Sequence, residues 1–161
     1  MSVFERVQQL HADYTTCKQA FHIAKSEAEA VRSATAGRLQ VARNQAAARI
    51  VELQSVMEDI CRSTTIRALA ADELETLRET VYTPTEAEET AFESAVQTAQ
   101  QAISDAREAK REMRDALTAL SADIQAIRAE VLGDSDLDLM PRWIDGEERN
   151  FDRLRECRAY E

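Results

Sequence analysis

The sequence predicts an all-α fold: an elongated antiparallel coiled-coil helical hairpin with a short middle helix and a short C-terminal amphipathic helix. Apolar residues recur with alternating spacings of four and three along two long stretches, and a helix-breaking segment separates the stretches. The composition agrees, because the 161 residues include only 3 Gly and 2 Pro, and 31 % are charged while 5 % are aromatic. Such a composition is typical of long helices rather than of a mixed α/β core.

The first long helix is expected at about residues 2–62. Ser2 and Glu5 have the spacing of a capping box, in which each side chain accepts the backbone N–H of the other residue. The apolar residues that follow fit a heptad seam, and these are Val3, Val7, Leu10, Tyr14, Cys17, Phe21, Ala24, Ala28 and Val31. A stripe with this 3.5-residue repeat has to be buried, and it predicts left-handed supercoiling.

The seam is interrupted near Gly37 and resumes at Leu39, from which it continues to Ile60. Glycine costs about 1 kcal/mol relative to alanine inside a helix. We expect a continuous helix with a soft point at Gly37 rather than a break.

A short middle helix is expected at about residues 72–82, with Asp72 as its cap. The segment VYTPTEAEE then interrupts the helical pattern. We expect Thr83 to cap the next helix, because Pro84 would then occupy the first helical position, where its missing N–H costs nothing, and Glu86 the third.

The second long helix is expected at about residues 84–132. Twelve positions keep the 4–3 spacing, and eleven of them are apolar: Phe92, Val96, Ala99, Ile103, Ala106, Lys110, Met113, Leu117, Leu120, Ile124, Ile127 and Val131. Lys110 is the exception. Gly133 follows as the type of residue that commonly ends a helix.

The hairpin register leaves the start of the chain uncovered. If residues near 60 face residues near 88, Val131 faces Cys17 and residues 3–14 have no partner. The apolar side chains of this overhang are Val3, Phe4, Val7, Leu10 and Tyr14. A second subunit, a partner protein or the tail after residue 141 has to bury them, and docking of the tail is the favoured solution.

Residues 133–161 are predicted to form an acidic joint and a tail helix, which divides the chain into segments 1–132 and 133–161. Asp145 and Glu148 form another capping-box pattern, so the tail helix is expected from Asp145 to about residue 160. Trp143, Phe151 and Leu154 lie on or next to its apolar face. A helix this short is marginal alone in water, and we expect it to dock within the chain or in the groove of a partner.

The joint GDSDLDLMPRW contains alternating aspartates. A calcium-binding loop from Asp134 is not expected, because its sixth position would be Leu139 instead of Gly and its ninth would be Arg142, which offers no oxygen ligand. We interpret the joint as a solvated linker whose leucines pack on the hairpin. A linear docking motif that uses Leu137 and Leu139 is the functional alternative.

The net charge of −10 is unevenly distributed. Residues 18–49 carry six bases against two acids, whereas residues 52–105 carry twelve acids against three arginines. The simplest interpretation is a solvated helix surface, and the alternative is a surface that pairs with a partner of opposite charge. Nucleic acid is not an expected partner, since the bases are spread out and aromatic residues do not alternate with them.

No catalytic, cofactor-binding or metal-binding constellation is predicted. His11 and His22 would lie about 16 Å apart along one helix, and Cys17, Cys61 and Cys157 are isolated thiols that indicate a reducing compartment, most simply the cytoplasm. A two-helix hairpin offers no cleft, so no small-molecule substrate is expected. No apolar run approaches the length of a membrane span, and the N-terminus lacks the apolar core of a signal peptide.

The function expected from these features is that of a non-enzymatic coiled-coil protein–protein interaction module: a scaffold, stalk, chaperone or assembly factor. Its partner would be another protein or a second copy, the latter through residues 3–14. The expected partner-binding residues are Val3, Phe4, Val7, Leu10, Tyr14, Leu137, Leu139, Trp143, Phe151 and Leu154. The alternative is an acidic inhibitor or mimic whose residues 72–93 occupy a basic site of a partner protein.

Overall fold

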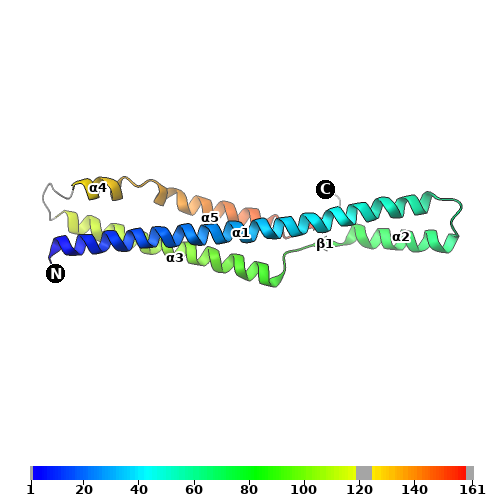
Figure 1. Cartoon of the computed structure of the whole chain (residues 1–161), viewed down its shortest axis with the longest axis horizontal. Coiled ribbons are helices and arrows are strands. Elements are labelled where there is room, and N and C mark those ends of the chain that lie inside the picture. The colour runs from blue at the N-terminus through cyan, green and yellow to red at the C-terminus, as the bar shows by residue number, and fades with distance from the viewer. Residues whose placement is uncertain (1, 119–124, 159–161) are drawn as a thin grey trace. The chain divides into compact units, whose positions relative to one another are not determined.

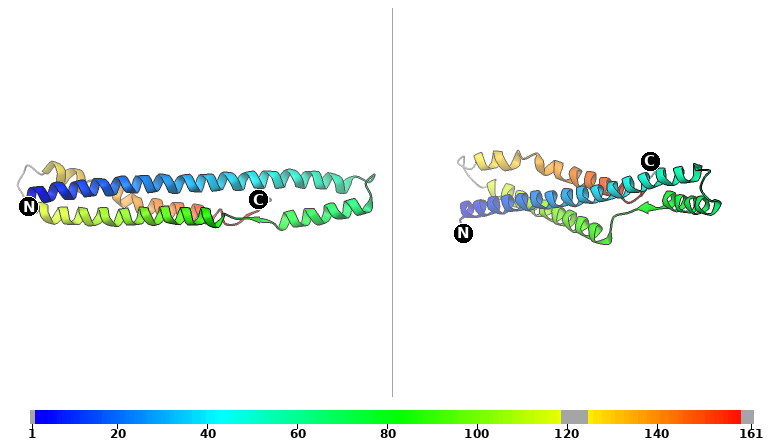
Figure 2. Two further views of the ribbon diagram at one scale, coloured as in Figure 1. Left: turned by 60° about the horizontal axis from the view of Figure 1, so that its bottom comes forward. Right: turned by 45° about the vertical axis from the view of Figure 1, so that its right-hand side comes forward.

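The computed structural model describes residues 2–118 and 125–158, apart from the side chains of 125–127 and 130. Its helices are α1 (Val3–Glu58), α2 (Thr64–Glu79), α3 (Glu86–Leu117), α4 (Gln125–Leu132) and α5 (Asp136–Asp152), and its strands are β1 (Val81–Tyr82) and β2 (Cys157–Arg158) (Figure 1). The predicted all-α hairpin is confirmed, because the long α1 packs against α3 (Figure 2).

The first long helix forms as predicted. The Ser2 N–H donates to Glu5 Oε2 over 2.7 Å, and the Glu5 N–H donates to Ser2 Oγ over 3.2 Å, which completes the capping box. Helix α1 continues without a break through Gly37. Most of its predicted seam is buried: Val7, Leu10, Tyr14, Phe21, Ala24 and Ala28, and then Leu39, Ala46, Ile50 and Leu53.

The short middle helix begins earlier than predicted. Helix α2 starts at Thr64, and its N-cap is Ser63, whose hydroxyl accepts the N–H of Ile66, so Asp72 is not a cap. Ala70 and Leu74 of α2 pack with Ile50 and Leu53 of α1 in one apolar cluster. Helix α2 is therefore part of the hairpin, because it packs directly against α1.

This position of α2 changes the register of the hairpin. Three ion pairs join α1 to the returning chain: Arg49 with Glu73 at 2.8 Å, Arg38 with Glu88 at 2.7 Å and Arg6 with Glu112 at 3.0 Å. In each pair the midpoint between the two residue numbers falls at 59–63. This is where the chain turns between α1 and α2. The predicted pairing of residues near 60 with residues near 88 is wrong, and so is the overhang that it implied.

The second long helix differs from the prediction at both ends. Its N-cap is Thr85, which forms a capping box with Glu88 (2.8 and 3.2 Å), so Thr83 and Pro84 precede the helix. Helix α3 ends at Leu117 and α4 is a separate helix. Heptad spacing predicts which side of a helix is buried, but two successive helices can share one continuous spacing pattern. The predicted seam residues Leu120 and Ile124 and the Ile127 side chain lie outside the described residues.

Helix α5 corrects the prediction of an acidic joint followed by a helix from Asp145. The helix begins at Asp136, and it includes Pro141 and places Asp145 in its interior. Its buried side chains are Leu137, Met140, Ile144, Glu147 and Phe151, which follow a 3–4 spacing. Each large apolar side chain contributes about 1.5–3 kcal/mol on burial, which together exceeds the cost of about 3 kcal/mol of a proline inside a helix.

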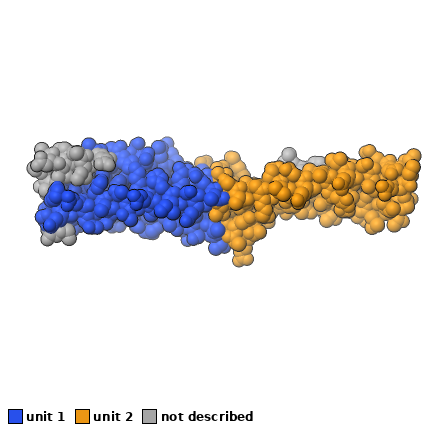
Figure 3. Space-filling model, in the orientation of Figure 1, with its two compact units in different colours: residues 1–30, 90–148 blue, residues 31–89, 149–161 orange. Residues whose placement is uncertain are grey.

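The described chain packs as two compact units, coloured separately in Figure 3. Unit 1 comprises residues 1–30 and 90–148. In this unit the first part of α1, most of α3 and the following α4 and α5 lie side by side (Figures 1 and 2). Lys18 contacts Asp134, and Glu29 contacts Trp143, so α5 runs parallel to α1. Unit 1 is thus an up-down-up arrangement of three helical layers.

Unit 2 comprises residues 31–89 and 149–161 and holds the second part of α1 against α2. Strands β1 and β2 pair antiparallel, with Val81 opposite Arg158 and Tyr82 opposite Cys157. Arg43 Nε donates to the Arg158 carbonyl over 3.1 Å, which fixes this ladder to α1. The division into segments 1–132 and 133–161 stays a prediction.

Replacing Gly37 with alanine should stabilise the protein by about 1 kcal/mol, because the glycine lies inside α1 and a Cβ there meets nothing within 4 Å. The change in the free energy of unfolding can be measured by urea denaturation. Gly133→Ala is the contrasting variant, since its Cβ would lie 2.6 Å from the Ala129 carbonyl oxygen and should destabilise the protein. Equal effects of the two variants would contradict this description of α1.

Thr35→Val should also stabilise the protein, by about 1 kcal/mol. Thr35 is buried on the seam of α1, and its hydroxyl makes no hydrogen bond to any described residue. A valine of the same shape removes this unpaired group. Thr98→Val is the matched control: Thr98 is exposed and its hydroxyl donates to the Ser94 carbonyl over 2.9 Å, so urea denaturation should show no gain.

Candidate functional site

The expected partner-binding residues at the N-terminus are divided by the structure. Val7, Leu10 and Tyr14 are buried within unit 1, whereas Val3 and Phe4 are about half exposed. The burial follows from the register, because the Arg6–Glu112 ion pair brings the end of α3 beside the start of α1. The three buried residues therefore present no open apolar seam to a second subunit.

The expected partner-binding residues at the C-terminus are divided in the same way. Leu137 and Phe151 are buried, Trp143 and Leu154 are partly buried, and Leu139 is exposed. Leu139 lies on α5 one residue before the buried Met140. Of the two leucines in the proposed docking motif, only Leu139 is thus accessible.

Trp143 joins α5 to α1. Its ring meets Phe21 edge to face with centroids 5.8 Å apart, and its Nε1–H donates to Glu29 Oε1 over 3.0 Å. The Lys25 ammonium lies 5.3 Å from the centre of the indole ring. The C-terminal helix docks within the chain, but on residues 21–29 of α1 and not on the predicted overhang at 3–14.

Asp134 lies between α4 and α5 and contacts two side chains of α1. Its carboxylate accepts hydrogen bonds from the Tyr14 hydroxyl and, over 2.5 Å, from the Lys18 ammonium, which also lies 3.6 Å from Asp136. Partial burial raises the pKa of Asp134, but the bonds from Lys18 and Tyr14 outweigh it, so the pKa lies below its ordinary value. The aspartates that resembled a calcium loop therefore bind a lysine in this structure.

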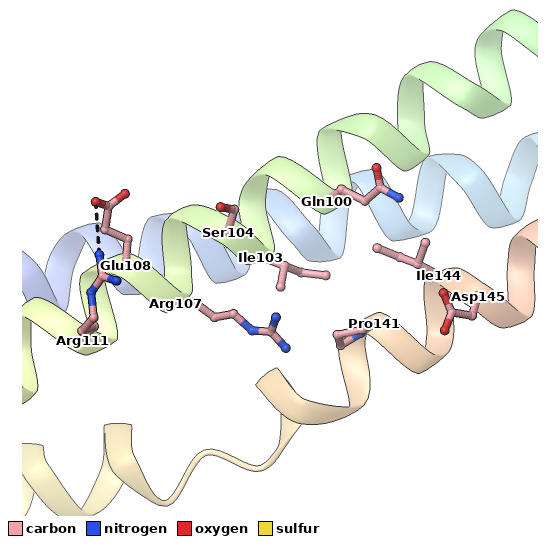
Figure 4. Close-up of a pocket in the computed structure, with 9 residues that line it drawn as sticks. All are labelled: Gln100, Ile103, Ser104, Arg107, Glu108, Arg111, Pro141, Ile144 and Asp145. Atoms are coloured by element: carbon pink, nitrogen blue, oxygen red, sulfur yellow. Dashed lines mark ion pairs between the residues drawn. The ribbon is translucent and has the colours of Figure 1, made fainter.

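A groove lies between α3 and α5 in unit 1, with a volume of about 560 Å³. Ile103, Pro141 and Ile144 form its apolar floor, and Gln100, Ser104 and Arg107 contribute polar groups. Figure 4 shows Ile103 and Ile144 pointing toward one another and Arg107 extending from α3 toward Pro141. The expectation that the fold has no cleft is wrong, because α5 adds a third helix beside the predicted pair.

Unit 2 exposes apolar side chains in the turn between α1 and α2 and in the first two turns of α2. Ile60 is 85 % exposed, Leu69 63 % and Ile66 44 %; we call these three residues the arm tip. The neighbouring Cys61 is also exposed. Sequence patterning missed the arm tip because Ile60 fits the α1 seam by spacing, although α1 ends at Glu58 before that position.

The charged stretches are partly engaged in ion pairs within the chain. In the basic stretch 18–49, Lys18, Arg38 and Arg49 form ion pairs with carboxylates. In the acidic stretch 72–93, the carboxylates of Glu73, Glu88 and Glu89 pair with arginines. The bond from Arg38 is the main cause that lowers the pKa of Glu88 to about 2. Ion pairs between the basic and the acidic stretch therefore join α1 to the returning chain.

The reactive side chains do not gather at one place. Phe21 packs edge to face on His22, with ring centroids 5.5 Å apart. Burial, together with the nearby Asp105 and Asp13 carboxylates, raises the pKa of the Cys17 thiol. Among the described residues, no three histidine, cysteine or carboxylate side chains come close enough to hold a metal ion. Among the helices of the described residues, none combines the length and the apolar character that a membrane span requires.

Comparison of the chain with protein-family models, with curated proteins and with solved structures finds no match. The candidate sites consequently rest on the geometry of this chain.

Asp134→Asn should destabilise the docking of α5 by about 1–2 kcal/mol, because it removes the charge that the partly buried Lys18 contacts. Since the folded-state pKa of Asp134 is depressed, its contribution is present above the ordinary carboxyl pKa and is lost as the pH falls through the folded value, below about pH 4. Unfolding followed by fluorescence of Trp143 measures both effects. Asp138→Asn, at an exposed position of α5, should change neither.

Proposed function

We propose that this chain is a non-enzymatic protein–protein interaction module of the scaffold or assembly-factor kind, and that it contacts its partner through the arm tip. The observation that carries this proposal is the exposure of Ile60, Ile66 and Leu69 at the turn of the hairpin. Three exposed apolar side chains within residues 60–69 are more than the isolated exposed residues that are ordinary on a protein surface, and exposed apolar surface of this kind is characteristic of sites that bind other proteins.

The arm tip has no evident role in folding. The nearby core of Ile50, Leu53, Ala70 and Leu74 closes without it. The turn itself is held by polar groups, because the Asp59 carboxylate accepts the Cys61 N–H over 2.9 Å and Ser63 caps α2. A hydrophilic residue at position 60 would serve this turn equally well, so the isoleucine supports a role in contact with another molecule.

The proposal includes further contacts at exposed apolar residues outside the arm tip. Val3 and Phe4 at the start of α1 and Leu139 on α5 remain accessible as further contacts. The acidic mimic is the rival proposal, and the ion pairs of Glu73, Glu88 and Glu89 weaken it because they occupy carboxylates that a mimic would present. Salt separates the two, since apolar contacts persist at about 0.5 M NaCl whereas contacts between exposed charges are screened.

A photo-reactive benzophenone amino acid at position 60 or 69 should cross-link a specific protein in cells that produce this chain naturally. The same group at position 41 is the control, because Val41 is similarly exposed in unit 2 but lies away from the turn. Mass spectrometry identifies the cross-linked protein, and the purified complex should survive 0.5 M NaCl.

The double variant Ile60→Ser, Leu69→Ser should lose this complex without a change in thermal stability, because both side chains are exposed. Cross-linking of equal strength from positions 41, 60 and 69 would contradict an interface at the arm tip. A complex that dissociates in 0.5 M NaCl would favour the acidic mimic instead.

A further inference from the structure

We propose that the groove between α3 and α5 binds the C-terminal end of a short apolar peptide, with Arg107 contacting the terminal carboxylate. This site lies entirely within unit 1 and is independent of the arm tip in unit 2. It is also a different kind of site from the partner-binding residues expected from the sequence, none of which lines the groove.

The size and floor of the groove suit an apolar peptide segment. Its volume of about 560 Å³ lies within the range of pockets that hold small ligands and short peptide ends. Ile103 and Ile144 are buried at its base, and Pro141 lies beside them on α5 (Figure 4). A leucine or valine side chain of the peptide would contact Pro141, which is partly exposed, and the small exposed parts of Ile103 and Ile144.

Arg107 supplies the polar end of the site. Its side chain extends across the space between the helices toward Pro141 (Figure 4). Its guanidinium group makes no hydrogen bond or ion pair with the described residues, whereas the neighbouring Arg111 lies 3.7 Å from Glu108. A planar guanidinium group binds a carboxylate through two parallel hydrogen bonds, which a point charge such as lysine cannot do.

Among the described charged side chains that line the groove, Arg107 is the one without a hydrogen-bond or ion-pair partner. Glu108 is paired with Arg111, and Asp145 lies at the other side of the groove next to Ile144. The complementary ligand is therefore apolar along its length and anionic at one end, and Gln100 and Ser104 offer an amide and a hydroxyl to its backbone.

The test uses the full chain and the peptide acetyl-Leu-Ala-Leu-Leu in two forms, with a free C-terminal carboxylate and with a C-terminal carboxamide. Nuclear magnetic resonance of isoleucine methyl groups reports on the site, because Ile103 and Ile144 both line it. The free-carboxylate form should shift the resonances of these two residues and leave Ile60 unaffected. The carboxamide form should bind about tenfold more weakly, since it lacks the charge-assisted bonds.

Variants of arginine assign the carboxylate contact. Arg107→Met should abolish the difference between the two peptides, and Arg107→Lys should restore part of it. Arg114→Met is the matched control, because Arg114 is an exposed arginine of α3 outside the groove and should leave both affinities unchanged. Circular dichroism verifies that each variant is folded.

Three results would overturn the proposal. These are unshifted Ile103 and Ile144 resonances at millimolar peptide, equal affinity for the two peptide forms, and an equal loss of binding in the Arg107 and Arg114 variants. A carboxamide peptide with an added glutamate side chain distinguishes the source of the carboxylate. If it bound as tightly as the free-carboxylate form, the C-terminus would not be what the groove recognises.

Discussion

The turn at residues 59–63 is the constraint on which the rest of the structure depends, because its position decides which residues of α1 face the returning chain. Asp59 and Ser63 define it with side-chain hydrogen bonds to the backbone N–H groups of Cys61 and Ile66. With the chain reversed there, the ion pairs on α1 fall into one register. The register predicted from the sequence, with residues near 60 facing residues near 88, would have left the first turns of α1 uncovered. The exposure of the arm tip is a consequence of the same turn.

Much of the fold could be predicted from heptad spacing, because burial of one face determines that spacing directly. Most of the seam of α1, and that of α3 as far as Leu117 apart from Lys110, are buried where expected, although Val3 at the start of α1 is about half exposed. The predicted hairpin does not include the third helical layer of unit 1, although α3 carries a signal for it. Ala95, Ala102 and Ala109 form a second buried stripe at seven-residue spacing. A face this wide indicates that a helix packs against two neighbours rather than one.

The start of α5 and the presence of the groove could not be predicted from local sequence signals such as prolines and capping patterns. The 3–4 spacing of Leu137, Met140, Ile144 and Phe151 indicates a helix from Asp136, whereas Pro141 and the capping-box spacing of Asp145 and Glu148 indicate a later start. Burial of that face against α1 outweighs the local cost of the proline. The groove could not be predicted, because it arises where Ile103 and Arg107 of one helix meet residues some forty positions away in the sequence. Only tertiary packing brings them together.

The most direct test of the central register is a distance measurement between spin labels at positions 49 and 73, and separately at positions 38 and 88. Labels attached through non-cysteine chemistry leave the three native thiols unchanged, and double electron–electron resonance gives the distance distributions. Facing positions on packed helices, whose axes lie about 8–10 Å apart, should give a short, narrow distribution for both pairs. A long or broad distribution for either pair would contradict a hairpin centred on residues 59–63.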